Sequence, residues 1–282
     1  MDELHVDEPL AAFWDGQDPF AWLAAATGER FRDLPTRRTF RFEVDGEGFF
    51  AKLHLGVGWG EIVRNLLQLR LPVVDARRER DAIAALQAAR VPTPTTVAWG
   101  VRGRDPARRR SFIVTREVPT QFSLDDLARR WGELGRCEPA LKHRLIRQVA
   151  ELTRRMHDAG INHRDLYLVH WLLPGTPGAD DALCLIDLHR AQLRARVPRR
   201  WRVKDLGSLL FSARVAPLTR ADRLRFVRAY RGEPLRALLP AEAGFWAAVG
   251  RRADRLWAEG LRKGVVRAPR VLPGAPARGR AS

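Results

Sequence analysis

The sequence predicts an α+β protein with two unequal lobes, a smaller one built on an antiparallel sheet and a larger one that is mainly helical. Three observations support this fold class. Up to residue 118, short runs alternate bulky apolar with charged residues and are separated by turns. Beyond residue 123, apolar residues recur at helical spacing. With 282 residues, of which 45% are hydrophobic, the chain is large enough for an extended core and too apolar for wholesale disorder.

A hairpin is the first clear element of the smaller lobe. Thr39–Val44 alternates apolar and charged residues, Asp45–Gly48 supplies a turn, and Phe49–Leu53 begins the second strand. The stretch 59–69 then has helical spacing. We interpret its apolar stripe as core packing. The alternative is a helix that lies on an anionic bilayer.

The rest of the smaller lobe is predicted to contain a helix and a second pair of strands. Residues 75–89 have helical spacing and end before a segment with two prolines. Residues 96–100 and 111–118 are typical of strands on either side of a charged turn. The smaller lobe is therefore assigned to residues 1–118.

The larger lobe is assigned to residues 119–261. Its first helix is expected after Ser123, because the two aspartates that follow suit a helix start. The most regular amphipathic helix is predicted over Leu141–Ala159. The remaining elements are a short hairpin and three helices, at 172–173 with 183–186, Val203–Ser212, Arg220–Arg231 and Ala241–Leu261. Residues 262–282 are rich in Arg, Pro, Gly and Ala, and are expected to be disordered.

The chain is strongly basic, with 50 lysines and arginines against 33 acidic residues and a formal net charge of +17. Such a surface attracts nucleic acid, an anionic membrane or a phosphorylated substrate. All but four of the basic residues are arginines, so genomic base composition is an alternative source of part of this charge. Two cysteines exclude a disulfide framework, and no apolar run is long enough to span a membrane. Because the N-terminus is acidic, unlike a signal peptide, we expect a cytoplasmic protein.

The stretch most indicative of chemistry is a His-Arg-Asp triplet, His163–Asp165, which follows an expected helix and leads into an expected strand. A second acid, Asp187, follows the next apolar strand. Upstream, Lys52 lies inside a strand and Glu79 in a helix after it. A strand lysine, a helix glutamate, a catalytic-loop aspartate and a metal-binding aspartate occur in this order in protein kinases. We therefore predict a bilobal, protein-kinase-like fold.

Each of these groups has a role in phosphoryl transfer from ATP with Mg²⁺. Lys52 is expected to hold the nucleotide phosphates, and Glu79 to pair with Lys52 and fix its position. Asp165 would accept the proton of the attacking hydroxyl. Asp187 would bind Mg²⁺, a hard cation that prefers carboxylate and phosphate oxygens. The residues assigned to catalysis are Asp165, His163 and Arg164.

Two features depart from the protein-kinase pattern. His170 stands where protein kinases have a metal-binding asparagine, and histidine is a poorer Mg²⁺ ligand than an oxygen donor. We keep it as a candidate metal ligand. The loop over the phosphates is not glycine-rich, and the turn 35–38 occupies its place, so arginine side chains can substitute for backbone N–H groups. The further residues assigned to nucleotide binding are Arg37, Arg38, Glu117 and Val118.

Other functions are compatible with parts of the sequence. Four histidines within residues 157–189 invite a zinc interpretation, but no paired Cys/His spacing supports it. A small-molecule kinase of the aminoglycoside-phosphotransferase type would have the same lobes, although an arginine-rich acceptor side would repel a cationic aminoglycoside. The non-enzymatic alternative is a basic nucleic-acid-binding protein. The sequence contains no helix-turn-helix, zinc finger or aromatic RNA platform, so no nucleic acid is expected.

Four stretches of the sequence resemble a known family. They are Phe13–Phe20, Thr36–Phe42, Ile161–Leu173 and Ile186–Arg202. In them the chain is similar to the lipopolysaccharide core heptose(I) kinases, the WaaP or RfaP family, and the similarity extends from about Pro9 to Arg262. The family also resembles this chain in having a histidine at the position of His170. The resemblance identifies Asp165 as the catalytic aspartate.

The resemblance implies ATP-dependent phosphorylation of the first heptose of the lipopolysaccharide inner core, at O4. It also implies action at the inner face of the inner membrane of a Gram-negative bacterium, and acyl carrier protein as a bound partner. The acceptor would be a dense polyanion, because it carries lipid A phosphates and Kdo carboxylates, and arginine binds both groups bidentately. The residues assigned to acceptor binding are Arg194, Arg196, Arg199, Arg200 and Arg202. Alternatively, any one of these arginines belongs to a solvated basic surface and binds no acceptor. Lys204 and Asp205 are candidates for bracing the catalytic loop.

Overall fold

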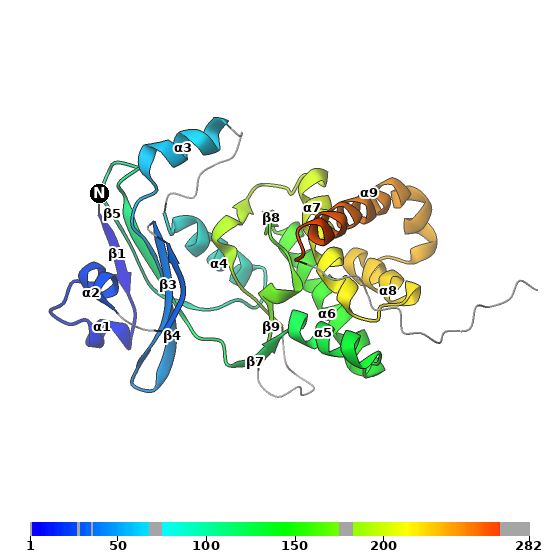
Figure 1. Ribbon diagram of the computed structural model, residues 1–282, viewed down its shortest axis with the longest axis horizontal. Coiled ribbons are helices and arrows are strands. Elements are labelled where there is room, and N and C mark those ends of the chain that lie inside the picture. The colour runs from blue at the N-terminus through cyan, green and yellow to red at the C-terminus, as the bar shows by residue number, and fades with distance from the viewer. Residues whose placement is uncertain (1, 27–28, 35, 68–74, 175–182, 266–282) are drawn as a thin grey trace, which may run out of the picture.

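The chain folds into two lobes that lie next to each other (Figure 1). The structure is a computed structural model that describes residues 2–26, 29–34, 36–67, 75–174 and 183–265. The α+β, bilobal, protein-kinase-like fold predicted from the sequence is confirmed. The predicted lobe boundary at residue 118 falls between β6 (Arg110–Arg116) and β7 (Thr120–Ser123). Within the described ranges, no helix is both long enough and apolar enough to cross a membrane.

The smaller lobe is built on a six-stranded antiparallel sheet with the strand order β1-β5-β6-β4-β3-β2. The predicted hairpin forms part of it, and Thr39 lies opposite Lys52. Phe49, Ala51 and Leu53 are buried on one face, so the alternation of the strand places Lys52 on the other. The remaining strands and the hairpin strands are β1 (Glu3–Val6), β2 (Glu29–Leu34), β3 (Arg37–Val44), β4 (Glu47–His54) and β5 (Thr96–Arg102).

Two short helices that the sequence analysis missed cover one face of this sheet, α1 (Leu10–Phe13) and α2 (Pro19–Ala25) (Figure 1). Leu10 and Phe20 are buried among the apolar side chains of the strands. Phe20 packs edge-on against Phe112 of β6, with the ring centroids 4.9 Å apart. Helices of four and seven residues contain too few turns for an amphipathic period to be visible in the sequence.

The other helices of the smaller lobe are α3 (Gly58–Leu67) and α4 (Arg77–Ala88). The core packing predicted for the segment that contains α3 is wrong. Trp59 is 58% exposed and Leu67 is 81% exposed, whereas Ile62 is buried. The helix is attached along one side only and projects from the edge of the lobe (Figure 1). The last two residues of that predicted segment lie outside the described part of the chain.

The larger lobe contains the predicted helices and the predicted hairpin. Its first helix begins as expected, because Ser123 and Asp126 accept each other's backbone N–H groups in a capping box. The last helix starts before the predicted position, because the chain stays helical through Pro240. The helices are α5 (Leu124–Leu134), α6 (Pro139–Asp158), α7 (Arg199–Ser212), α8 (Arg220–Arg231) and α9 (Leu235–Arg262), with 3₁₀ turns η1 (Leu168–His170), η2 (Leu188–Arg190) and η3 (Ala213–Val215). The short strands are β8 (Ile161–Asn162), β9 (Trp171–Pro174), β10 (Cys184–Leu185) and β11 (Gln192–Leu193). The part of the predicted tail at 266–282 lies outside the described residues.

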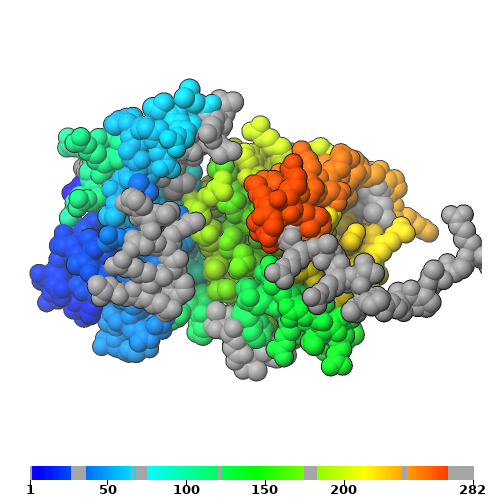
Figure 2. Space-filling model, viewed as in Figure 1, coloured from blue at the N-terminus to red at the C-terminus, as the bar shows by residue number. Residues whose placement is uncertain are grey.

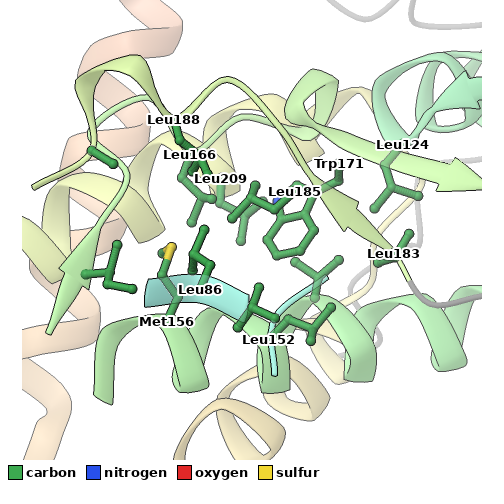
Figure 3. Close-up of a cluster of buried hydrophobic side chains, with 14 of the residues drawn as sticks. Leu86, Leu124, Leu152, Met156, Leu166, Trp171, Leu183, Leu185, Leu188 and Leu209 are labelled. Carbon is green, nitrogen blue, oxygen red and sulfur yellow. The ribbon is translucent and has the colours of Figure 1, made fainter. Parts of the chain in front are cut away.

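A buried apolar cluster in the larger lobe supports the catalytic segment (Figure 3). Leu166 and Leu188 belong to it and are almost completely buried. These leucines directly follow the predicted catalytic residue Asp165 and the predicted metal ligand Asp187. Leu86 of α4 packs in the same cluster. The helix of the smaller lobe that carries the predicted glutamate is thus packed against the larger lobe as well.

Candidate active site

The predicted lysine, glutamate and metal-binding aspartate meet between the lobes. Lys52 Nζ on β4 lies 2.5 Å from Glu79 Oε1 on α4 and 3.3 Å from Asp187 Oδ1, next to η2. Glu79 is 4% exposed, so the lysine holds its carboxylate in a buried position. Burial alone would lower the pKa of Lys52, but the charges of Glu79 and Asp187 outweigh burial and raise that pKa above its usual value. The lysine is therefore a fixed cation.

Asp187 is held by several hydrogen-bonding and cationic groups. His189 Nδ1 donates to Asp187 Oδ1 over 2.6 Å, and His170 Nε2 lies 3.6 Å from Oδ2. Burial alone would raise the pKa of Asp187, but the hydrogen bond from His189 and the charge of Lys52 hold it well below its usual range. The backbone of Asp187 is left-handed, with φ of 64°. A conformation this costly persists where the surroundings fix it, as they do at many functional sites.

A buried aspartate fixes the catalytic loop. Asp205 on α7 is completely buried and accepts the backbone N–H groups of His163 and Arg164, each over 2.8 Å. Arg164 has φ of 76°, a strained conformation for a non-glycine residue, and these two hydrogen bonds stabilise it. His163 Nε2 donates to the carbonyl of Ile186 over 3.1 Å, which joins the loop to the residue before Asp187. The bracing role predicted for Asp205 is confirmed.

Arg190 contacts the predicted catalytic base directly. Its Nη1 donates to the two carboxylate oxygens of Asp165 over 3.0 and 2.8 Å. The side chain of Asp165 is 20% exposed, so an acceptor hydroxyl can reach it. Arg190 is not among the residues that the sequence assigns to the site. Its pairing with Asp165, 25 residues away in the chain, has no signal in the sequence.

Of the two predicted Mg²⁺ ligands, Asp187 suits the ion better than His170. Among the described residues, no group of three or more His, Cys, Asp or Glu side chains is arranged to hold a metal by itself. Mg²⁺ commonly binds one or two carboxylates together with substrate phosphates and water, and the ionised, partly exposed Asp187 meets that requirement. His170 fits less well, because its Nδ1 donates to the carbonyl of Asp165 over 2.7 Å and its other nitrogen is a poor Mg²⁺ ligand.

Arg37 and Arg38 lie at the start of β3, after a turn whose first residue is outside the described ranges. Arg38 Nη1 donates to the carbonyl of Ala24 over 2.9 Å, so α2 engages this side chain. Arg37 is close enough to Lys52 for the two charges to repel each other. Of the two predicted arginines, Arg37 thus has the clearer relation to the lysine of the site.

Glu117 and Val118 lie in the connection between the two lobes. The side chain of Glu117 accepts from Arg41 Nε over 2.9 Å, and its backbone N–H donates to the carbonyl of Gly48 over 2.8 Å. The carboxylate of Glu117 is therefore engaged within the smaller lobe. Val118 is half-buried. For both residues, nucleotide binding stays a prediction.

Of the five arginines assigned to the acceptor, Arg194 and Arg196 lie between β11 and α7, and the other three lie at the start of α7. Three have partners in the protein. Arg194 donates to a glutamine of β11 over 2.7 Å, Arg199 donates to a carbonyl of α9 over 3.0 Å, and Arg202 lies 3.5 Å from a carboxylate of α6. Arg196 and Arg200 are exposed. Acceptor binding stays a prediction for all five.

Trp201 gathers cations next to the catalytic loop. Its ring centroid lies 5.3 to 5.7 Å from the charged groups of Arg164, Arg194, Arg200 and Lys204. Burial and then the charge of Arg164 lower the pKa of Lys204. An accumulation of positive charge of this kind favours an anionic ligand.

A basic cavity and an apolar cavity lie in the described part of the larger lobe. One, of about 650 Å³, is lined by basic residues and lies between the segment before α7 and the first half of α9. Its charged lining residues are Arg196, Arg199, Arg202, Arg231 and Glu242. The other, of about 330 Å³, is almost entirely apolar and lies among α5, α6, α7, α8 and α9.

The structure adds His189, Arg190 and Trp201 to the residues predicted for the site. His189 and Arg190 lie two and three residues after Asp187, so their position in the chain was an available signal. Trp201 had a weaker signal, since it is an aromatic residue within the arginine-rich run.

Comparison with known proteins agrees with this geometry. The model of the lipopolysaccharide kinase (Kdo/WaaP) family matches residues 22–230. The chain belongs to this family. It is therefore a kinase, and the order of Lys52, Glu79, Asp165 and Asp187 is that of a kinase site.

Characterised relatives match nearly the whole chain. The chain is 48% identical to the lipopolysaccharide core heptose(I) kinase WaaP of Pseudomonas aeruginosa over 264 residues, which cover 93% of this chain and 98% of that one. It is 43% identical to the protein of the same name from Escherichia coli K12, over 93% of this chain and 100% of the relative. A solved structure of WaaP in complex with acyl carrier protein superposes with a TM-score of 0.77 at 44% identity, covering 90% of this chain and 99% of that one.

Proposed function

We propose that this kinase phosphorylates the first heptose of the lipopolysaccharide inner core, at O4, with ATP as the phosphoryl donor. One observation carries the proposal: Lys52, Glu79 and Asp187 converge in a chain that is 48% identical to a heptose(I) kinase. Family membership also favours this function over the aminoglycoside-type kinase and the nucleic-acid-binding protein considered above.

The residues of the site have separate roles in the reaction. Lys52, positioned by Glu79, would bind the nucleotide phosphates, and Asp187 would hold Mg²⁺, which neutralises charge on the phosphate oxygens when bound. Asp165 accepts the proton of the heptose hydroxyl as the hydroxyl oxygen attacks the γ-phosphorus of ATP, and the bond from that phosphorus to the bridging oxygen breaks to release ADP. Arg190 keeps the Asp165 carboxylate oriented. Because the transferring group is highly charged, fixed cations contribute a large part of the stabilisation of the transition state.

Acceptor binding is proposed for the arginine-rich segment before and at the start of α7. The cations around Trp201 and the basic cavity next to them support this assignment. The inner core presents phosphates and carboxylates, and both are matched by the planar donor groups of arginine.

Acyl carrier protein is proposed as a partner, because a solved relative is described in complex with it. The apolar cavity among the helices of the larger lobe supports a role for the acyl group of that partner. Its lining includes Leu145, Val149, Leu206 and Phe226, which would surround an alkyl chain with apolar atoms.

The inner face of the inner membrane is proposed as the site of action. A glycolipid acceptor is held in a bilayer, so the enzyme has to work at its surface. The net charge of +17 supports this location, because an anionic leaflet attracts a basic protein.

The test of this function is transfer of labelled γ-phosphate from ATP with Mg²⁺ to lipopolysaccharide that lacks core phosphate. Wild type is expected to label the heptose, and Asp165→Asn to lose at least about 10²-fold in kcat, since it has no base. Arg228→Ala, on the exposed side of α8, is the matched control and is expected to keep wild-type activity. Equal labelling by Asp165→Asn would contradict the catalytic assignment. Labelling of an aminoglycoside in place of lipopolysaccharide would identify the alternative kinase.

A further inference from the structure

The helix α3 exposes large apolar side chains along one stripe. Trp59, Val63 and Leu67 are 58%, 49% and 81% exposed. They follow one another at intervals of four residues and therefore share one face of the helix. Ile62 lies on a neighbouring face of the helix. It is 6% exposed and attaches α3 to the lobe. Single exposed apolar residues are ordinary, but three aligned on one face form a patch that indicates an interaction.

Exposed arginines lie on α3 and on the turn that packs against its start. Arg64 lies beside the apolar stripe on the helix and is exposed. The turn that connects β5 with β6 packs against the start of α3, where the N–H of Gly58 donates to the carbonyl of Ala107 over 3.0 Å. This turn carries two more exposed arginines, Arg104 and Arg108, and the side chain of Arg108 is 90% exposed. Apolar residues bordered by arginines are the composition of a helix that lies at a bilayer interface.

These residues form one surface, which we call the α3 surface. Its members are Trp59, Val63, Leu67, Arg64, Arg104 and Arg108. α3 and the segment that leads into α7 both lie along the upper edge of the molecule in Figures 1 and 2. That segment contains arginines proposed to bind the acceptor. A membrane in contact with α3 would therefore lie on the side of the molecule where the acceptor is proposed to bind.

We propose that the α3 surface docks the protein on an anionic phospholipid bilayer. The inference rests on the proposed function only in identifying that bilayer as the membrane that holds the glycolipid acceptor. An anionic bilayer fits both parts of the surface, since the apolar stripe enters the acyl boundary while the arginines contact lipid phosphates. A second copy of this chain fits less well, because each copy has a net charge of +17 and the arginines of the two α3 surfaces would repel each other.

The test is flotation of the full chain with vesicles of phosphatidylglycerol and phosphatidylcholine, compared with vesicles of phosphatidylcholine alone. Wild type is expected to bind the anionic vesicles. Leu67→Glu is expected to weaken that binding by on the order of tenfold, because a leucine that would enter the bilayer is replaced by a charge that anionic lipid repels. Arg104→Gln with Arg108→Gln is expected to weaken it about fivefold for each arginine. Leu134→Glu, which changes a leucine of α5 that is 55% exposed, is the matched control and is expected to bind like wild type.

Unchanged vesicle binding by Leu67→Glu, or an equal loss in Leu134→Glu, would overturn the proposal. So would a loss of binding to acyl carrier protein in the α3 variants without a loss of vesicle binding, since the occupant would then be a protein. Thermal unfolding of each variant shows that the fold is intact.

Kinase assays separate this inference from the proposed function. The α3 variants are expected to phosphorylate a soluble core oligosaccharide, freed of lipid A, at the wild-type rate, and to be slower only on acceptor embedded in vesicles. If wild type phosphorylates neither acceptor, the proposed function fails while the vesicle-binding result still decides the docking proposal. Slower transfer to the soluble oligosaccharide by Leu67→Glu would count against docking, because α3 would then act on the site itself.

Discussion

At the scale of single residues, a buried carboxylate holds the loop that contains the predicted catalytic base. Asp205 accepts two backbone N–H groups of a loop in which Arg164 has a positive φ. Hydrogen bonds to an ionised acceptor are stronger than neutral ones. His163, in the same loop, bonds to the carbonyl before Asp187. The positions of both acids of the site therefore depend on one buried side chain.

Replacing that side chain by its amide tests this dependence. In Asp205→Asn a single oxygen remains as acceptor, so one buried N–H loses its partner. We expect the free energy of unfolding in urea to fall by about 1–3 kcal/mol, and kcat to fall as well. Asp165→Asn is the comparison, because it is expected to lower kcat without lowering stability. An Asp205→Asn variant with wild-type stability would show that the loop holds its conformation without these bonds.

Arg190 is a positioning residue in this account. Arg190→Ala is expected to lower kcat by about 10- to 100-fold with little change in KM for ATP, since the Asp165 carboxylate loses the group that orients it. Arg190→Lys is expected to recover part of the loss, because it restores a charge but not the planar geometry of the guanidinium. Steady-state kinetics of both variants, with Arg228→Ala as a control, measure the effect. A rise in KM for ATP with kcat unchanged would assign Arg190 to nucleotide binding.

The residues that the sequence points to are those with a local signal. Asp165 and Asp187, whose roles stay predictions, each follow or precede a strand in a recognisable order, and Asp205 was a candidate for bracing the loop. The contacts that were missed connect distant parts of the chain. Arg190 in η2 contacts Asp165, 25 residues earlier in the chain, and Trp201 contacts four cations that come from three segments. Contacts of this kind leave no periodic pattern in the sequence.

At the scale of secondary structure elements, α3 shows the limit of periodicity most clearly. Apolar residues spaced along a helix predict which side is apolar, but they do not determine whether another element covers that side. In α6 the stripe is covered and Leu145, Val149 and Met156 are buried. In α3 only Ile62 is buried among the residues whose exposure is described. The difference arises from tertiary packing, which the sequence pattern does not contain.

The strand β4 carries a histidine that makes stability depend on pH. His54 is 3% exposed, and burial, followed by the charge of Arg37, lowers its pKa to about 4. In the unfolded chain its pKa is about 6.5, so below that pH the unfolded state binds the proton first and stability falls until the folded pKa is reached. From pH 7 to pH 4, wild type is expected to lose about 3 kcal/mol more unfolding free energy than His54→Leu.

Chemical unfolding of the two proteins at several pH values between 7 and 4 measures this difference. His54→Leu removes the titrating group and places an apolar side chain of similar size at the same buried position. Parallel pH dependence in the two proteins would mean that His54 is protonated as readily in the folded state as in the unfolded chain.

At the scale of the whole molecule, the groups proposed to bind the nucleotide and those proposed to bind the acceptor are different. Lys52 is proposed for the nucleotide phosphates, whereas the arginines near Trp201 are proposed for the acceptor. Arg199→Gln with Arg200→Gln is therefore expected to raise KM for lipopolysaccharide by about tenfold and to leave KM for ATP unchanged. Initial rates with each substrate varied separately provide the measurement. A matched rise in both KM values would contradict the separation.

The packing of α4 has a consequence for control of the enzyme. One end of this helix supplies Glu79 to the lysine, and Leu86 near its other end is embedded in the core of the larger lobe. In switchable kinases, displacement of the corresponding helix separates the lysine from the glutamate. Here that displacement would open a buried core, so the ion pair is the resting condition. We therefore expect α4 to keep Glu79 next to Lys52 whether or not a nucleotide is bound.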